Sequence, residues 1–187
     1  MNKIDLEFKI KMARKFLDKI PEGTPKNHAQ QMRLEENASV FLFFASSVIE
    51  IVKRHINDTF EIFDKKNVFY MHGLRKNLAN SGIQKKTKNT ITNYFSVPQR
   101  IGTTTNVNKS SLWRLQALRN QAMHGNIIQV SNGTLLFPYT IHDEGNYRFV
   151  QKSKNPQKYF GQIFDDLAEF TEKILQICQT QAQAKSN

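Results

Sequence analysis

The sequence predicts a mostly α-helical protein, a helical bundle with a small antiparallel β insertion before its last long helix. Apolar residues recur at three- and four-residue steps over 27–57, 112–124 and 157–180. Between 126 and 150 the apolar period changes to short runs separated by turn signals. The chain has 187 residues, 39% of them hydrophobic, which is enough to bury one core. We therefore expect one domain over 1–187.

The N-terminal arm, residues 1–25, has a pattern that fits either a strand or a helix. Its apolar residues alternate at first as in a strand, but a subset also keeps a four-residue helical step through Ile4, Phe8, Met12, Phe16 and Ile20. The sequence does not decide between these two structures. Pro21 to Pro25 breaks whichever element precedes it.

The rest of the chain divides into four predicted helices and the β insertion. The first helix spans about Asn27 to Asn57, and a second starts at Asp58 as its N-cap and ends near Asn80. Residues 84–108 are polar and basic, which predicts a mobile loop. The third helix, Leu112 to His124, should turn its leucines inward, and the β insertion at 126–150 contains the hairpin signal Asn132-Gly133. The last helix runs over 157–180, and a polar tail follows at 181–187.

Composition excludes several classes of protein. The only cysteine, Cys178, cannot form an internal disulfide or a thiolate zinc site by itself, which fits a reducing cytoplasm. The longest uncharged apolar stretch has 13 residues, fewer than the roughly 20 that span a bilayer. We expect a cytoplasmic protein with no membrane partner, no metal site and no cofactor.

Positive charge is concentrated in the middle of the chain. The formal net charge is +11, and no acidic residue occurs between Lys65 and Asp143. Such a segment creates a positive field, for which nucleic acid is the commonest polyanionic partner, although a solvated face kept for solubility has the same pattern. The candidate RNA-binding residues are Lys85, Lys86, Lys88, Arg100, Lys109 and Arg114.

One short segment at the end of the third helix could carry chemistry. Arg119 is followed by polar Asn120 and, five positions after the arginine, by His124. Asn120 and His124 are four positions apart and share a face, and Arg119 is long enough to reach around the helix. The carbonyl end of the helix favours a protonated histidine whereas a nearby arginine opposes it, and a balance between them suits acid–base chemistry near neutral pH.

This segment resembles the HEPN superfamily (higher eukaryote and prokaryote nucleotide-binding domains), whose hallmark is an arginine, four to six residues, then a histidine. The resemblance implies an HEPN-like helical bundle that acts as a metal-independent endoribonuclease and hydrolase of RNA. Two copies would form a homodimer with a composite site, in which attack of a ribose 2′-hydroxyl on the adjacent phosphate cleaves the chain. His124 would move the proton, Arg119 would stabilise charge on the phosphate, and Asn120 would orient the phosphate or the imidazole. The resemblance also implies a toxin or phage-defence (abortive-infection) role with an antitoxin protein as partner.

Other interpretations of these residues remain open at this point. Arg119 could form an ion pair with a carboxylate of the first helix such as Glu50, and His124 could be an ordinary histidine at a helix end. The protein could also be a non-catalytic basic module that binds RNA or an acidic protein. A third hypothesis is an antitoxin-like or scaffolding helical protein whose charge keeps it soluble.

Overall fold

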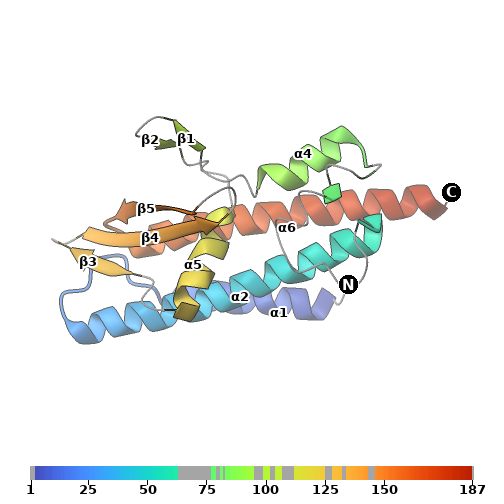
Figure 1. Ribbon diagram of the computed structural model, residues 1–187. Helices are drawn as coiled ribbons and strands as arrows, with labels where there is room; N and C mark the ends of the chain where they lie inside the picture. Colours follow the sequence, from blue (N-terminus) through green and yellow to red (C-terminus); the bar gives the residue numbers. More distant parts are fainter. Residues whose placement is uncertain are drawn as a thin grey trace.

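Two long helices, α2 (His28–Phe60) and α6 (Pro156–Ser186), lie side by side at the centre of the molecule, as Figure 1 shows. The computed structural model describes residues 3–62, 77–78, 81, 83–94, 99–101, 104–106, 112–124, 128–131, 134–142 and 146–186. Over these residues the fold is mostly helical, as the sequence predicts. The aromatic rings of Phe41 and Phe160, both fully buried, meet edge to face at 5.6 Å between the two helices.

The first long helix begins where the sequence predicts but extends further. Asn27 is its N-cap, and its side chain accepts a hydrogen bond from the amide of Gln30 at 2.9 Å. Asp58 was predicted to cap a second helix, which is wrong, because residues 58–60 continue α2 without a break. The helix ends at Glu61, whose left-handed backbone (φ 53°) lets its amide donate to the carbonyl of Asn57. Most of the remaining residues up to Asn80 lie outside the described part.

The N-terminal arm is a helix, α1 (Lys3–Leu17), packed against α2. Its buried residues are Leu6, Ala13 and Leu17, whereas Ile4 and Phe8 of the predicted apolar stripe are 79% and 51% exposed. The helical alternative is therefore confirmed, but only the later part of the predicted stripe enters the core, where Phe16 packs and Ile20 is buried.

The third helix, α5 (Trp113–His124), crosses the central pair, and the predicted β insertion follows it (Figure 1). The insertion is an antiparallel meander in the order β3-β4-β5, with β3 at Gln129–Ser131, β4 at Thr134–His142 and β5 at Asn146–Ser153. Ser131 pairs with Thr134, which is the register that a two-residue turn requires. The last strand extends three residues beyond the predicted end at 150.

The predicted loop over 84–108 is wrong, because part of it is regular. It contains a short helix, α4 (Lys85–Asn93), and a two-stranded hairpin of β1 (Gln99–Ile101) and β2 (Thr104–Asn106). Only Ile91 of α4 is buried, so the apolar signal for this helix is one residue in nine. The ring of Tyr94, directly after α4, packs 5.2 Å from that of Phe170 and thereby docks the helix on α6. Tertiary packing, rather than local pattern, explains this element.

The last helix also differs from the prediction at its C-terminal end. Asn155 caps it by accepting from the amide of Lys158 at 2.8 Å, and Pro156 occupies the first helical position. The helix continues through most of the segment predicted as a polar tail and ends at Ser186. Gln, Ala and Lys, the main residues of that segment, all propagate a helix well. None of the described helices has the length and apolar character needed to cross a bilayer.

Candidate active site

Helix α5 is held against the core along one side. Leu112, Leu115 and Leu118 are fully buried and Ala122 is half-buried, which confirms the predicted inward face. The backbone amide of Leu112 donates to the carbonyl of Tyr94, and α5 packs on both α2 and β4. The opposite side of α5 is consequently left on the surface.

Two of the three predicted catalytic residues are at the surface of α5. Asn120 lies on that outer side, about 140° around the helix from Leu115, whereas Arg119 lies only about 40° from Leu115. Arg119 and Asn120 are both exposed, and the guanidinium of Arg119 donates a long hydrogen bond of 3.4 Å to the amide oxygen of Asn120. His124 is the last residue of α5, nine positions after Leu115. Nine residues are two and a half helical turns, so position 124 lies on the side of the helix opposite the buried Leu115. The side chain of His124 is outside the described part.

The structure does not contain the alternative ion pair between Arg119 and Glu50. The carboxylate of Glu50 accepts instead from the ammonium of Lys53 at 2.7 Å. Within the described residues, no carboxylate lies at salt-bridge distance from Arg119. An exposed guanidinium without an internal counter-ion among these residues can bind an external anion such as a phosphate.

Arg114 was predicted to bind RNA, and this is wrong. Its side chain is 3% exposed, and its guanidinium donates to the carboxylate of Asp166 at 2.9 Å. It also lies 5.8 Å from the centre of the Tyr159 ring, so α6 surrounds it with an anion and an aromatic face. Arg114 therefore anchors the first turn of α5 to α6 and is not available to a polyanion.

Asp166 was missed in the sequence, although a signal for it exists. It lies four residues before Phe170 and three after Ile163, within the apolar stripe that α6 turns toward the core. A carboxylate at such a position requires a buried cation. The sequence does not identify Arg114 as that cation, because the two residues are 52 positions apart.

Burial controls the protonation of the groups around this ion pair. It raises the pKa of Asp166 to about 6, and the neighbouring Arg114 only partly opposes the shift. Burial also raises the pKa of Tyr159 well above its usual range, again against a smaller opposing effect of Arg114. The carboxylate of Asp166 is thus ionised at neutral pH but costs free energy to keep so.

We expect the Asp166 carboxyl to make folding stability depend on pH. Its pKa is raised from 3.8 to about 6 on folding, so the folded protein binds the proton more tightly than the unfolded chain. The resulting stabilisation is fully present below about pH 4 and is lost as pH rises through 6. Asp166→Asn lacks this titrating group and serves as the reference. Relative to this variant, the wild type should lose roughly 2 to 3 kcal/mol of unfolding free energy between pH 4 and pH 7. Urea unfolding at both pH values measures it.

The matched control is Asp165→Asn, which removes the exposed carboxylate next to Asp166 on the same helix. It changes the net charge by the same amount and keeps both partners of the pair with Arg114, since Asp165 makes only the smallest contribution to the raised pKa of Asp166. If both variants show the same pH dependence relative to the wild type, the effect comes from net charge and not from the buried carboxyl.

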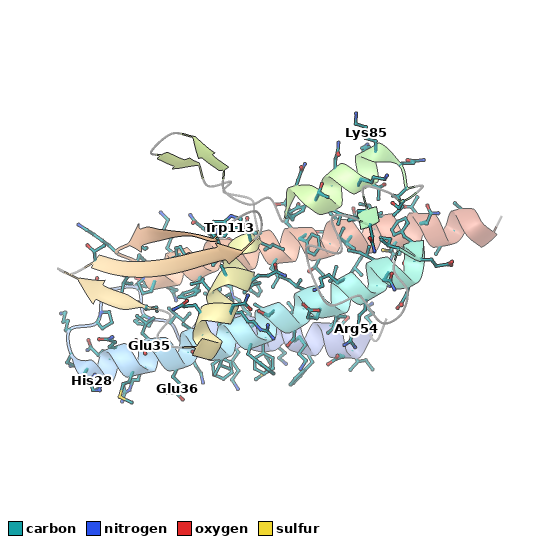
Figure 2. All side chains as sticks on the ribbon, in the orientation of Figure 1. His28, Glu35, Glu36, Arg54, Lys85 and Trp113 are labelled. Atoms are coloured by element: carbon teal, nitrogen blue, oxygen red, sulfur yellow. The ribbon has the colours of Figure 1, made fainter. Side chains whose placement is uncertain are left out.

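The other candidate RNA-binding residues have different surroundings. Lys85 and Lys86 are exposed on α4, whereas the ammonium of Lys88 folds back and donates to the carbonyl of Ser81 at 2.6 Å. Arg100 lies on β1, where it pairs with Thr105 of β2, and its side chain is outside the described residues. Lys109 lies outside the described part altogether. Figure 2 shows Lys85 at the outer edge of α4.

The described residues hold no metal-ligand cluster. In this part of the chain, no three histidine, cysteine or acidic side chains are close enough together to share a metal ion. An open groove of about 1120 Å³ lies where the ends of α2 and α6 meet the segment around Ser81, and none of its lining residues belongs to α5.

Comparisons with family models, with curated proteins and with solved structures find no match to this chain.

Proposed function

We propose that this protein is an HEPN-type endoribonuclease that cleaves RNA, without a metal ion, at a composite site in a homodimer. The observation that carries the proposal is the exposed pair of Arg119 and Asn120, one turn before the helix ends at His124. Arginine, a polar amide and histidine within the last turns of one anchored helix are the groups that RNA transesterification needs. The resemblance of this motif to the superfamily supports the same reaction.

The proposed reaction forms one bond to phosphorus and breaks another. The ribose 2′-oxygen attacks the adjacent phosphorus while its proton passes to an imidazole, and the 5′-oxygen of the next nucleotide leaves with a proton. The products are a 2′,3′-cyclic phosphate and a 5′-hydroxyl. His124 moves the protons, and Arg119 stabilises the negative charge that grows on the non-bridging oxygens. Asn120, whose amide oxygen accepts from Arg119, holds the guanidinium toward the phosphate.

Incubation of the purified protein with mixed-sequence RNA in EDTA tests this proposal. We expect the wild type to leave 2′,3′-cyclic phosphate ends and His124→Ala to leave the RNA intact. An all-DNA strand of the same sequence should stay whole, because it lacks the attacking hydroxyl. RNA that is bound but equally intact with both proteins would favour the non-catalytic binding module.

A toxin or phage-defence role with an antitoxin protein belongs to the same proposal. Only the resemblance supports it, and it requires the nuclease activity. Expression of the wild type should therefore arrest growth of a bacterial host, while His124→Ala at equal protein level should not.

The exposed lysines of α4 support RNA binding whether or not cleavage follows. Lys85 and Lys86 are adjacent at the start of the helix and both are exposed. If each contacts one phosphate, replacing both with alanine should weaken binding to single-stranded RNA. The dependence of log K on log salt should also become shallower by about 1.4, or about 0.7 for each phosphate. Titration with His124→Ala as background, at several salt concentrations, measures both effects without cleavage.

The control for this pair is Lys154→Ala with Lys158→Ala, which removes the same charge from two exposed positions around the start of α6. An equal loss of affinity in both double variants would show that net charge, rather than a binding surface on α4, attracts the RNA.

A further inference from the structure

One face of α2 points away from the core along most of the helix. Seven residues occupy it at steps of three and four, which keeps them on one side of an α-helix. Every one of them is exposed or half-buried. We call this face the α2 stripe; its residues are Met32, Glu36, Ser39, Phe43, Ser47, Glu50 and Arg54.

The α2 stripe exposes more apolar surface than a solvated helix face usually does. Met32 is 58% exposed and Phe43, at the middle of the helix, is 59% exposed. The Phe43 ring is held in place, because it meets the Phe44 ring at 5.3 Å and the ammonium of Lys9 at 5.8 Å. A fixed, exposed aromatic ring near the centre of a face is the usual anchor of a protein–protein contact.

The polar residues next to Phe43 can be covered without leaving a hydrogen-bonding group unsatisfied. The hydroxyl of Ser47 donates to the carbonyl of Phe43 at 2.8 Å, within the helix itself. The carboxylate of Glu50 accepts from Lys53 at 2.7 Å. Covering the hydroxyl of Ser47 therefore costs little desolvation free energy. The half-buried carboxylate of Glu50 keeps Lys53 as its counter-ion, so it would not be buried as an unpaired charge. The small Ser47 also leaves room for a large side chain opposite it.

The two ends of the stripe carry side chains of opposite charge. Glu36 and Arg54 are exposed, and they are 18 residues or five helical turns apart, about 27 Å along the axis. They therefore have the same angular position on α2 but opposite charge. Figure 2 shows Glu36 toward the start of the helix and Arg54 toward its end.

We propose that the α2 stripe binds the same stripe of a second copy of this chain, antiparallel and around a two-fold axis that passes between Phe43 and Ser47. In that register Glu36 faces the partner's Arg54 and Arg54 faces the partner's Glu36. Phe43 then lies over the partner's Ser47, and the reverse contact forms as well. A parallel arrangement would instead place like charges opposite each other, so charge complementarity selects the antiparallel one.

This interface would bring two copies of the candidate active site into one assembly. Helix α5 packs directly on α2, so an α2–α2 contact brings both α5 helices into the same dimer. That consequence rests on the proposed function, whereas the interface rests on the stripe alone.

Sedimentation equilibrium of the full chain without RNA tests the interface, at about 1 to 100 µM protein and about 0.15 M salt. We expect the wild type to dimerise and Phe43→Asp to raise the dimer Kd by roughly 100-fold, because it removes two buried rings from a symmetric contact. The control is Ile4→Asp on α1, which introduces the same charge at a residue that is 79% exposed and outside the stripe. Its Kd should stay within about threefold of the wild type.

Charge reversal then tests the register. Glu36→Arg and Arg54→Glu should each weaken the dimer by roughly 10-fold, and the two together should restore it to within about threefold. A double variant as weak as the single ones would overturn the antiparallel register. A circular dichroism melt of each variant confirms that it is folded.

The outcomes separate this inference from the proposed function. A wild-type protein that stays monomeric at about 100 µM, or dimerises unchanged in Phe43→Asp, overturns the interface whatever it does to RNA. If the wild type is a dimer that Phe43→Asp dissociates, the interface is supported. If that wild-type dimer leaves RNA intact, the proposed nuclease activity is overturned. If both proposals hold, Phe43→Asp should also lose cleavage at protein concentrations where it is monomeric.

Discussion

Arg114→Ala is expected to lower the free energy of unfolding by about 3 to 5 kcal/mol, the largest loss of stability among the substitutions considered. The alanine would leave the carboxylate of Asp166, which is only 15% exposed, without its cation in a poorly hydrated site. It would also remove the guanidinium from the face of the Tyr159 ring. Urea unfolding at pH 7, followed by circular dichroism, measures this change.

The matched control is Arg14→Ala, which breaks an ion pair of similar length on the surface. Arg14 binds Asp18 at 3.0 Å, but both side chains are more than half exposed, so its loss should cost about 1 kcal/mol or less. A second variant, Arg114→Met with Asp166→Leu, replaces both charges and should recover most of the stability, since no buried charge is left unpaired. If Arg114→Ala costs no more than Arg14→Ala, the buried pair does not anchor α5.

The anchor matters for function because of where it lies on α5. Arg114 fixes the first turn of the helix to α6, and the buried Leu115 and Leu118 fix its inner side. Arg119 follows directly after Leu118, so its backbone has little freedom to rotate or slide. A group that must meet a phosphate within a few tenths of an ångström is best placed on such an element.

The long helices and α5 could be predicted from the sequence because each has a continuous apolar period. In α5, the spacing of the leucines at 112, 115 and 118 was enough to identify the buried side. The β insertion was predictable for a similar local reason, since Asn132-Gly133 restricts the turn that joins β3 to β4. Periodicity and turn chemistry are local properties, and a sequence displays them directly.

The elements that were mispredicted depend on contacts between distant residues or on helix cooperativity. Asp58 has the chemistry of an N-cap, but extending an existing helix adds a hydrogen bond without a new nucleation cost. Helix α4 forms because Ile91 is buried and the adjacent Tyr94 docks on Phe170 of α6, which no pattern in its own nine residues indicates.

The same distinction holds within the candidate site. The exposure of Asn120 follows from helical phase, because it lies about 140° around α5 from the buried Leu115, so it could be predicted. The exposure of Arg119 could not, because it lies only about 40° from Leu115, on the side of the helix that the leucines bury. The burial of Arg114 could not, because the residue lies in the same basic segment as the exposed Lys85 and Lys86. Charge alone does not distinguish a cation that faces solvent from one that satisfies a buried carboxylate 52 positions away.

Arg119→Ala is expected to reduce the rate of RNA cleavage by about 1,000-fold, the largest effect on activity in the chain apart from loss of the catalytic histidine. In the proposed reaction the guanidinium would supply two parallel donors to the phosphate oxygens where negative charge develops, and alanine would supply none. Because this interaction strengthens in the transition state, kcat should fall far more than KM rises. Arg119→Lys, which keeps the charge but loses the paired donors, should lose about 10- to 100-fold. Single-turnover cleavage of a labelled RNA in EDTA measures all three proteins.

The structure offers a close control for this result. Arg14→Ala removes an exposed arginine from α1 and should leave cleavage within about twofold of the wild type, since a uniform loss of one charge affects RNA capture only slightly. Arg119 is exposed and Asn120 is its hydrogen-bond acceptor, so Arg119→Ala should not unfold the protein. If Arg119→Ala loses cleavage but melts at the same temperature as the wild type, the substitution impairs catalysis and not folding. Cleavage by Arg119→Ala at the rate of Arg14→Ala would show instead that the phosphate is stabilised by another group, and the role assigned to this end of α5 would have to be abandoned.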